Sequence, residues 1–279
     1  MGLEVAVEGS GDAGNGSGDA GARGPEGQED AVGEGGVDVV AIGPHPDDIE
    51  LFCGGTVARL ARSYRVVVLD LTRGERASNG SVAERALEAA AAAEVLGVLG
   101  REQLGLPDGG LDGRDARQVE ALVRALRRLK PKIVLAPHEV ARHPDHAEAG
   151  RLVARAAFLA GVGGYLSEVP RHRVREVVYY LERVEVEPSF AVDISEFMDV
   201  KQRAVNCHAS QLRGVVPTMV GSAASGEALR ARDARWGAQL GVAAAEAFVV
   251  GRLVAVADPV AAFGGEGGGP TLFPARRGA

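Results

Sequence analysis

Short apolar runs that alternate with helical patterns constrain the fold of this chain more than any other sequence feature. Three runs rich in β-branched residues occupy 37–43, 65–71 and 132–136. Continuous runs of this length are typical of strands buried on both faces of a parallel sheet. The helical patterns between them span 49–63, 82–98 and 114–129. This alternation predicts an α/β fold, doubly wound and Rossmann-like, in which helices flank a mostly parallel sheet.

The second half of the chain continues with strand and helix signals in a less regular order. We expect strands at 174–181 and 190–194, and helices at 196–211 and 226–246. Neither an internal repeat nor a change of composition marks a boundary within this part of the sequence. A single domain over 37–256 is therefore predicted.

The N-terminal residues 1–36 differ sharply from this body. They hold eight acids, one base and twelve glycines, while the whole chain has a net charge of −7. Such a segment buries too little apolar surface to offset its ordering entropy, so we predict a disordered acidic tail, and a second flexible tail over 257–279. The body between the tails is neutral, which argues against a nucleic acid partner.

The sequence also bears on the compartment in which the protein works. The apolar runs are much shorter than the roughly 20 residues that a transmembrane helix needs. Residues 1–5 contain no basic region followed by an apolar region, so no signal peptide is indicated. We expect a cytoplasmic protein with no membrane partner.

Two short motifs carry the candidate chemistry. His45-Pro46-Asp47-Asp48 follows the first predicted strand directly, and His143-Pro144-Asp145-His146 comes shortly after the run at 132–136. In an open parallel sheet, ligands bind beyond the carboxyl ends of the strands. Taken singly, an Asp before a helix can be a simple N-cap and two histidines can be surface residues. Two such motifs at strand ends favour a shared site.

The residue types in these motifs suit metal-assisted hydrolysis. His45, Asp48 and His146 supply two nitrogens and one oxygen, a ligand set that a catalytic Zn²⁺ accepts while keeping an open position. Asp47 remains free to act as general base. His143 can stabilise an oxyanion or protonate a leaving amine, with Asp145 orienting it. The motifs therefore predict zinc-dependent cleavage of an amide.

The same residues resemble a known family. The stretch 41–50, followed by Gly54-Gly55-Thr56, closely resembles the opening of the LmbE/PIG-L-like zinc N-deacetylases, and 143–146 is similar to their second motif. The likeness covers about 37–250. Further stretches resemble the branch of bacillithiol-biosynthesis deacetylases, at 70–75, 78–81, 84–85, 92–97, 106–109, 142–146 and 210–211.

This resemblance implies a specific reaction. Members of that branch convert N-acetyl-glucosaminyl-malate to glucosaminyl-malate and acetate, with the metal ligands and catalytic groups assigned above. It also implies that Arg85 and Arg142 lie at the substrate end of the site, where guanidinium groups suit the carboxylates of a malyl group. Homo-oligomers, trimers or hexamers, are expected from the same resemblance.

Some features of the chain depart from the family pattern and leave alternatives open. Pro44 stands where many relatives have a small residue, and the stretch 212–224 differs from the branch, which puts the aglycone in doubt. One alternative is a deacetylase of another GlcNAc conjugate, such as GlcNAc-inositol. A second is a metal-binding homologue without catalysis. A nucleotide-binding protein is disfavoured because no phosphate-binding motif is present.

Overall fold

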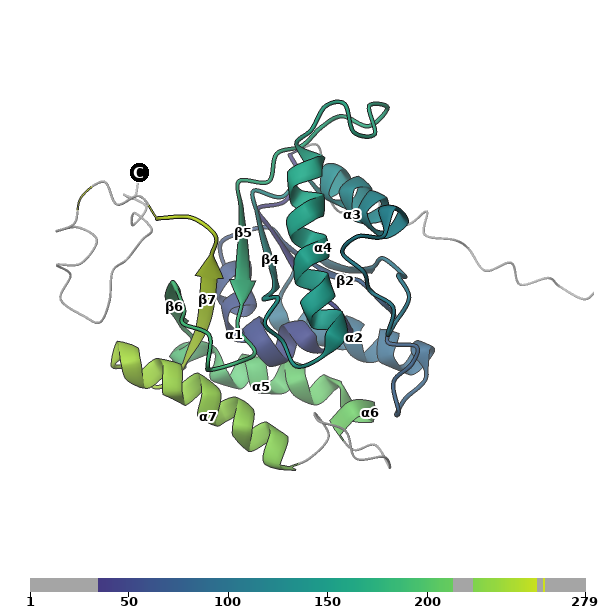
Figure 1. Ribbon diagram of the computed structural model, residues 1–279. Helices are drawn as coiled ribbons and strands as arrows, with labels where there is room; N and C mark the ends of the chain where they lie inside the picture. Colours follow the sequence, from purple (N-terminus) through teal and green to yellow (C-terminus); the bar gives the residue numbers. More distant parts are fainter. Residues whose placement is uncertain (1–34, 213–222, 255–257, 259–279) are drawn as a thin grey trace, which may run out of the picture. The chain divides into compact units, whose positions relative to one another are not determined.

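The computed structural model describes residues 35–212 and 223–254, together with Asp258. Most of the predicted tails and most of the stretch 212–224 lie outside these residues. The described chain forms a seven-stranded sheet in the order β3-β2-β1-β4-β5-β7-β6 (Figure 1). The strands are β1 (Val39–Gly43), β2 (Val66–Asp70), β3 (Gly100–Gln103), β4 (Ile133–Pro137), β5 (Glu176–Tyr180), β6 (Phe190–Asp193) and β7 (Ala245–Val250).

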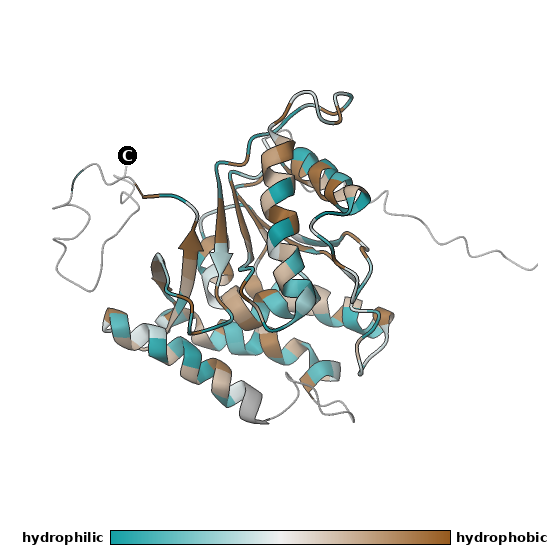
Figure 2. Ribbon diagram, viewed as in Figure 1, coloured by the Kyte–Doolittle hydropathy of each residue, from teal (hydrophilic) through white to brown (hydrophobic). Residues whose placement is uncertain are grey.

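Helices cover both faces of this sheet (Figure 1). They are α1 (Asp48–Ala61), α2 (Val82–Leu96), α3 (Ala116–Leu129), α4 (Pro144–Ala160), α5 (Met198–Cys207), α6 (Ala209–Leu212) and α7 (Ala223–Leu240). Successive residues of β1 enter different cores: Val40 packs with residues of α3 and α4, whereas Val39 packs with residues of α1 and α2. The central strands β1, β2 and β4 are accordingly mostly apolar, while the helices alternate polar and apolar faces (Figure 2).

The parallel α/β architecture predicted from the sequence is confirmed. β1, β2, β3, β4 and β5 pair in parallel, and the three strands and three helices predicted for the first half lie within two residues of their predicted bounds, whereas β3 and α4 were not predicted. Within the described residues, no helix is long and apolar enough to span a bilayer.

The C-terminal part of the prediction needs correction. The helix expected over 226–246 ends at Leu240, and Ala245 begins β7, which pairs antiparallel with β5 and β6. Gly241, in the left-handed conformation with φ 73°, separates the two elements. The alanine-rich sequence at 243–247 favours a helix by propensity, but burial between two strands overrides that preference. The helix expected at 196–211 is interrupted at His208.

Two strand ends define the functional edge of the sheet. From β1 the chain continues to β2 and β3 on one side, and it returns to β4 on the other side of β1. The gap between β1 and β4 is thus the topological switch point, where open α/β sheets bind ligands. Helices α1 and α4 begin at this edge, so both His-Pro-Asp motifs lie there (Figure 1).

Helix α1 is irregular one turn after the first motif. Cys53 has non-helical φ −144° and ψ 20°, which interrupts the hydrogen-bond ladder. The Glu246 carboxylate on β7 accepts hydrogen bonds from the backbone N–H groups of Gly55 (3.0 Å) and Thr56 (2.7 Å), and Lys201 Nζ lies 2.7 Å from it. A buried carboxylate from the far end of the chain therefore caps the second half of α1.

Replacing Glu246 should destabilise the whole domain. We expect Glu246→Ala to lower the free energy of unfolding by about 3–5 kcal/mol, because it leaves Lys201 partly unpaired in the core and two backbone donors without an acceptor. Chemical denaturation measures this difference. Glu168→Ala, which removes an exposed partner of Arg124, is the control and should cost at most about 1 kcal/mol. Equal effects would contradict the capping role.

Candidate active site

The two His-Pro-Asp motifs converge at the carboxyl ends of β1 and β4. One ligand atom from each of His45, Asp48 and His146 lies within 4.8 Å of the others, a spacing that a single metal ion could bridge. The rings of His45, His143 and His146 lie 5.0 to 5.3 Å apart, centroid to centroid. The fold thus brings together residues that are about one hundred positions apart in the sequence.

Asp48 is the link between the two motifs. Its Oδ2 accepts a hydrogen bond from the backbone N–H of His45 at 2.8 Å, and it lies 3.2 Å from His45 Nδ1 and 3.3 Å from His146 Nε2. The residue at the N-cap position of α1 is Asp47, so Asp48 is not the simple helix cap that the motif alone allowed. Two imidazoles and one carboxylate form a donor set that fits zinc.

Asp47 combines burial with a strained backbone. Its φ of 147° is unusual for a residue other than glycine, and such strain is typical of functional positions. Its side chain makes no capping hydrogen bond, and its Oδ2 lies 3.4 Å from Arg85 Nη2. Burial and the neighbouring charge of Asp48 raise the pKa of Asp47 to about 6, although Arg85 opposes the shift. A carboxylate with this pKa is suited to proton transfer near neutral pH.

His143 is an exposed residue at the start of α4. It is the N-cap of α4, and its Nδ1 accepts a hydrogen bond from the backbone N–H of Asp145 at 3.2 Å. An accepting Nδ1 places the proton of the neutral ring on Nε2. Burial and the charges of His45 and His146 lower the pKa of His143. The ring is therefore a neutral donor at pH 7.

Asp145 faces His45 more directly than it faces His143. Its Oδ2 lies 3.3 Å from His45 Nε2 and accepts the N–H of Gly109 at 2.7 Å, while its Oδ1 accepts the N–H of Leu111 at 3.3 Å. Its described hydrogen bond to His143 comes from the backbone N–H rather than from the carboxylate. His45, His143 and Asp145 also form a second group of ligand atoms within 4.8 Å.

The site concentrates charge of both signs in a buried space. Burial by itself lowers the pKa of His45, but contacts with Asp108, Asp145 and Asp48 outweigh it and raise that pKa to about 12. The pKa of His146 likewise rises to about 10 despite burial, through Asp48 and Glu182. The two imidazoles in turn hold the pKa of Asp48 well below its usual range. Binding a metal at these nitrogens requires them to release protons.

Two acidic residues of this site were not predicted from the sequence. Asp108 Oδ1 lies 3.2 Å from His45 Nε2, and Glu182 contacts His146 Nδ1. Asp108 follows β3, a strand of polar residues that lacks an apolar signal. Glu182 lies two residues after β5 and directly after the strand predicted at 174–181, so the rule that places ligands at strand ends could have found it.

The two arginines expected at the substrate end lie in different environments. Arg85 is buried, and its guanidinium donates to the carbonyl oxygens of Gly74 (3.1 Å) and Pro46 (2.9 Å) in addition to its contact with Asp47. Arg142 is exposed and adjoins His143 in the sequence. A role for either in binding the aglycone stays a prediction, and Arg85 supports the loop that carries Asp47.

A buried ion cluster supports the first turn of α1 from behind. The Arg101 guanidinium contacts both carboxylate oxygens of Asp70 (2.7 and 2.9 Å) and one oxygen of Glu50 (2.6 Å). His208 Nε2 lies 3.4 Å from the other oxygen of Glu50. Because Glu50 is two residues after Asp48, these contacts anchor the metal-ligating turn to the end of β2.

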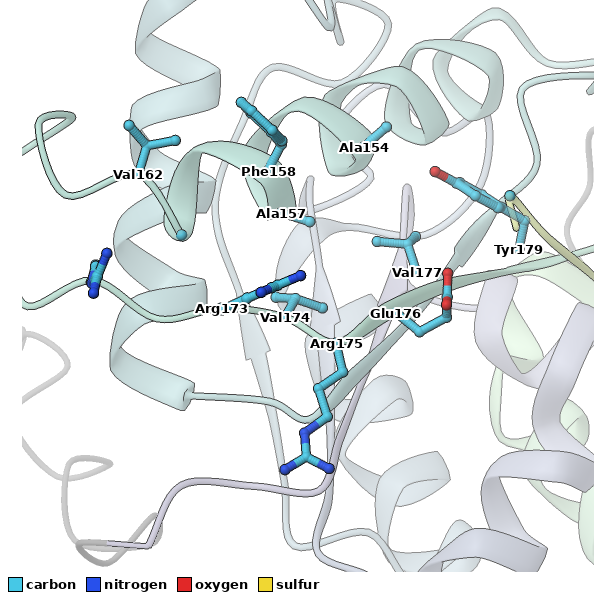
Figure 3. Close-up of a pocket in the computed structure, with 13 residues that line it drawn as sticks. Ala154, Ala157, Phe158, Val162, Arg173, Val174, Arg175, Glu176, Val177 and Tyr179 are labelled. Atoms are coloured by element: carbon cyan, nitrogen blue, oxygen red, sulfur yellow. The ribbon is translucent and has the colours of Figure 1, made fainter. Parts of the chain in front are cut away.

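A cavity of about 720 Å³ lies elsewhere, between α4 and β5 (Figure 3). Phe158 on α4 and Arg173 and Arg175 before β5 are among its lining residues. Phe158 lies in the C-terminal half of α4, whereas the second motif lies at the N-terminus of that helix, and the two arginines precede the amino end of β5. We assign this cavity no part in the chemistry.

Comparison with known proteins agrees with this site. A family model described as "PIG-L: GlcNAc-PI de-N-acetylase" matches residues 40–157. Diacetylchitobiose deacetylase of Thermococcus kodakarensis is 35% identical over 190 residues, which cover 62% of this chain and 69% of that protein. A probable N-acetyl-alpha-D-glucosaminyl L-malate deacetylase 2 of Bacillus cereus is 28% identical over 199 residues, 64% of this chain and 85% of that protein.

A solved structure is similar over nearly its entire length. The conserved protein TT1542 from Thermus thermophilus shares 42% sequence identity and a TM-score of 0.73, covering 79% of this chain and 98% of that one. The matched segment 40–157 contains both His-Pro-Asp motifs. With its fold, its metal-binding group and these relatives taken together, the chain belongs to the PIG-L/LmbE-like family of deacetylases.

Proposed function

We propose that this protein is a zinc-dependent hydrolase that removes the acetyl group from the acetamide of a GlcNAc conjugate. One observation carries the proposal. His45, Asp48 and His146 form a metal-binding group at the switch point of the sheet, while Asp47 and His143 lie beside it outside that group. The names of the relatives support an N-acetyl sugar as the substrate.

Zinc is the metal that best matches the donors. Two imidazole nitrogens and one carboxylate oxygen are the ligands of many catalytic zinc sites. Zinc bound by His45, Asp48 and His146 supplies Lewis-acid polarisation of the acetamide carbonyl and lowers the pKa of a bound water. Its ligands come from the loop after β1, from the first residue of α1 and from the first turn of α4, and they are brought together because β1 pairs with β4.

Asp47 moves the proton in this proposal. Its carboxylate takes a proton from the attacking water and later returns it to the nitrogen of the leaving amine. The raised pKa of Asp47 makes both transfers accessible near neutral pH. Arg85 holds the Asp47 carboxylate from behind through the 3.4 Å contact, and the strained backbone keeps that side chain out of the helix-capping position.

His143 stabilises the charge that develops on the carbonyl oxygen. Its neutral ring carries the proton on Nε2 and can donate a hydrogen bond to that oxygen. The backbone N–H of Asp145 fixes the ring through Nδ1, so the residue orients His143 by its main chain. The Asp145 carboxylate orients His45 instead.

A metal-binding protein without catalysis is less consistent with this arrangement. A site that only binds a metal gains nothing from keeping Asp47 buried and strained. It also gains nothing from a third imidazole that is held as a neutral donor at the edge of the site. These groups have a clear use in hydrolysis.

Replacing the base should separate catalysis from metal binding. We expect Asp47→Asn to lower kcat by about 10²–10⁴-fold, because the amide cannot accept the proton of water. Asn has nearly the same size and shape as Asp, so the backbone should be retained. Acetate release and zinc content by elemental analysis check the two effects. Asp199→Asn, at an exposed carboxylate of α5, is the matched control. Full activity of Asp47→Asn would refute the mechanism.

The proposal also concerns the identity of the aglycone, the group attached to GlcNAc. The resemblance favours the malate conjugate, of the bacillithiol type, and one relative is named for that substrate. Another relative is named for diacetylchitobiose, and a third for a GlcNAc-inositol compound. Arg142 is exposed next to His143, and its guanidinium suits a malyl carboxylate. We therefore assign GlcNAc-malate as the substrate to be tested first.

Replacement of Arg142 should show whether the protein recognises a charged aglycone or a neutral one. We expect Arg142→Ala to raise KM for GlcNAc-malate by about tenfold, which corresponds to about 1.4 kcal/mol, and to leave KM for diacetylchitobiose unchanged. Steady-state release of free amine from both compounds, and from GlcNAc-inositol, provides the measurement. Arg155→Ala, at an exposed position of α4, is the control. If the parent protein cleaves diacetylchitobiose but not GlcNAc-malate, the malate assignment is wrong.

A further inference from the structure

Glu182 contacts the ring nitrogen of His146 that lies away from Asp48. Its Oε1 pairs with His146 Nδ1, while His146 Nε2 lies 3.3 Å from Asp48 Oδ2. Glu182 lies two residues beyond the end of β5, and it enters neither of the two metal-binding groups. The imidazole is therefore held between a carboxylate of the metal site and a carboxylate outside it.

Among the described residues, His146 is the ionic partner of Glu182. The neighbouring Arg183 pairs with Glu185 instead, at 2.9 Å. The side chains of Glu182 and His146 are each only 8% exposed. A carboxylate buried to this degree is costly unless it is paired and hydrogen-bonded, so the contact with His146 accounts for its position.

The backbone around this contact is well anchored. The N–H of Leu181 donates to the carbonyl of Ala247 on β7 at 3.1 Å, and the Leu181 side chain is buried. The His146 ring also lies in a T-shaped arrangement with the Phe52 ring, with centroids 6.1 Å apart. The imidazole is thus restrained both by packing and by a hydrogen bond.

We propose that Glu182 is a positioning residue that selects which nitrogen of His146 binds the metal. An ionised carboxylate only accepts hydrogen bonds, so the ring proton lies on Nδ1 and the lone pair of Nε2 points toward Asp48 and His45. Metal-binding histidines commonly donate their second N–H to such a carboxylate, which fixes the ring and makes it a stronger ligand. This inference rests on the proposed role of His146 as a metal ligand.

Zinc affinity tests the inference without reference to any substrate. The metal-free forms of the parent, Glu182→Ala and Glu182→Gln are titrated with Zn²⁺ in competition with a chromogenic chelator. We expect the dissociation constant to increase by about 10–100-fold in Glu182→Ala. Glu182→Gln should show a smaller increase, because its amide oxygen still accepts from Nδ1 but carries no charge. Glu185→Gln, on the same segment and exposed, is the control and should match the parent.

The ring proton provides a second readout. Long-range ¹H–¹⁵N spectra of the zinc-loaded parent should show His146 protonated at Nδ1. A His146 protonated at Nε2, or a Glu182→Ala affinity within twofold of the parent, would overturn the proposal. If Glu182→Ala fails to fold, the zinc affinity of Glu182→Gln and the spectrum of the parent still test whether Glu182 holds the proton on Nδ1 of His146. Weaker zinc binding by the Glu182 variants of a parent that cleaves no GlcNAc conjugate would refute the proposed function while supporting the role of Glu182.

Discussion

The parallel pairing of β1 with β4 is the constraint on which the site depends. Val39 pairs with Ile133 and Ala41 with Leu135, so the two strands end at the same edge of the sheet. The first strand leads directly into His45 and Asp48, and the second leads into the loop before His146. Helices α1 and α4 begin at this edge and pack on opposite faces of the sheet, because the chain order reverses there. A change in that register would separate the ligands.

Burying so many charged groups in one place requires compensation. Asp48 is stabilised by two imidazoles, and His45 is surrounded by three carboxylates. The buried Arg101 forms ion pairs with both Asp70 and Glu50 beneath the first turn of α1. These pairs limit the cost of removing charges from water, and they hold the donors in place before a metal arrives. Preorganisation of this kind allows a fixed site to bind metal without rebuilding the surrounding loops.

The C-terminal part of the chain completes the site from a distance. Glu246 on β7 caps the second half of α1, and Lys201 on α5 balances its charge. The segment that follows β5 supplies Glu182, and its backbone is tied to β7 through Leu181. The antiparallel strands therefore support the ligands of the parallel half, although they contribute none of the three metal ligands themselves.

The amino-acid sequence by itself determined the parallel α/β core and the donor set. Continuous β-branched runs are typical of strands buried on both faces, and His45, Asp48 and His146 are recognisable from residue type and from their place after strands. Only the tertiary structure decided which side chains contact these donors and the helix that carries them. Asp108 follows a polar strand, Glu182 and Glu246 have ordinary local sequences, and Arg85 points inward. Such contacts join residues far apart in the chain, so a local pattern can place Glu182 at a strand end but cannot name the residue that it contacts.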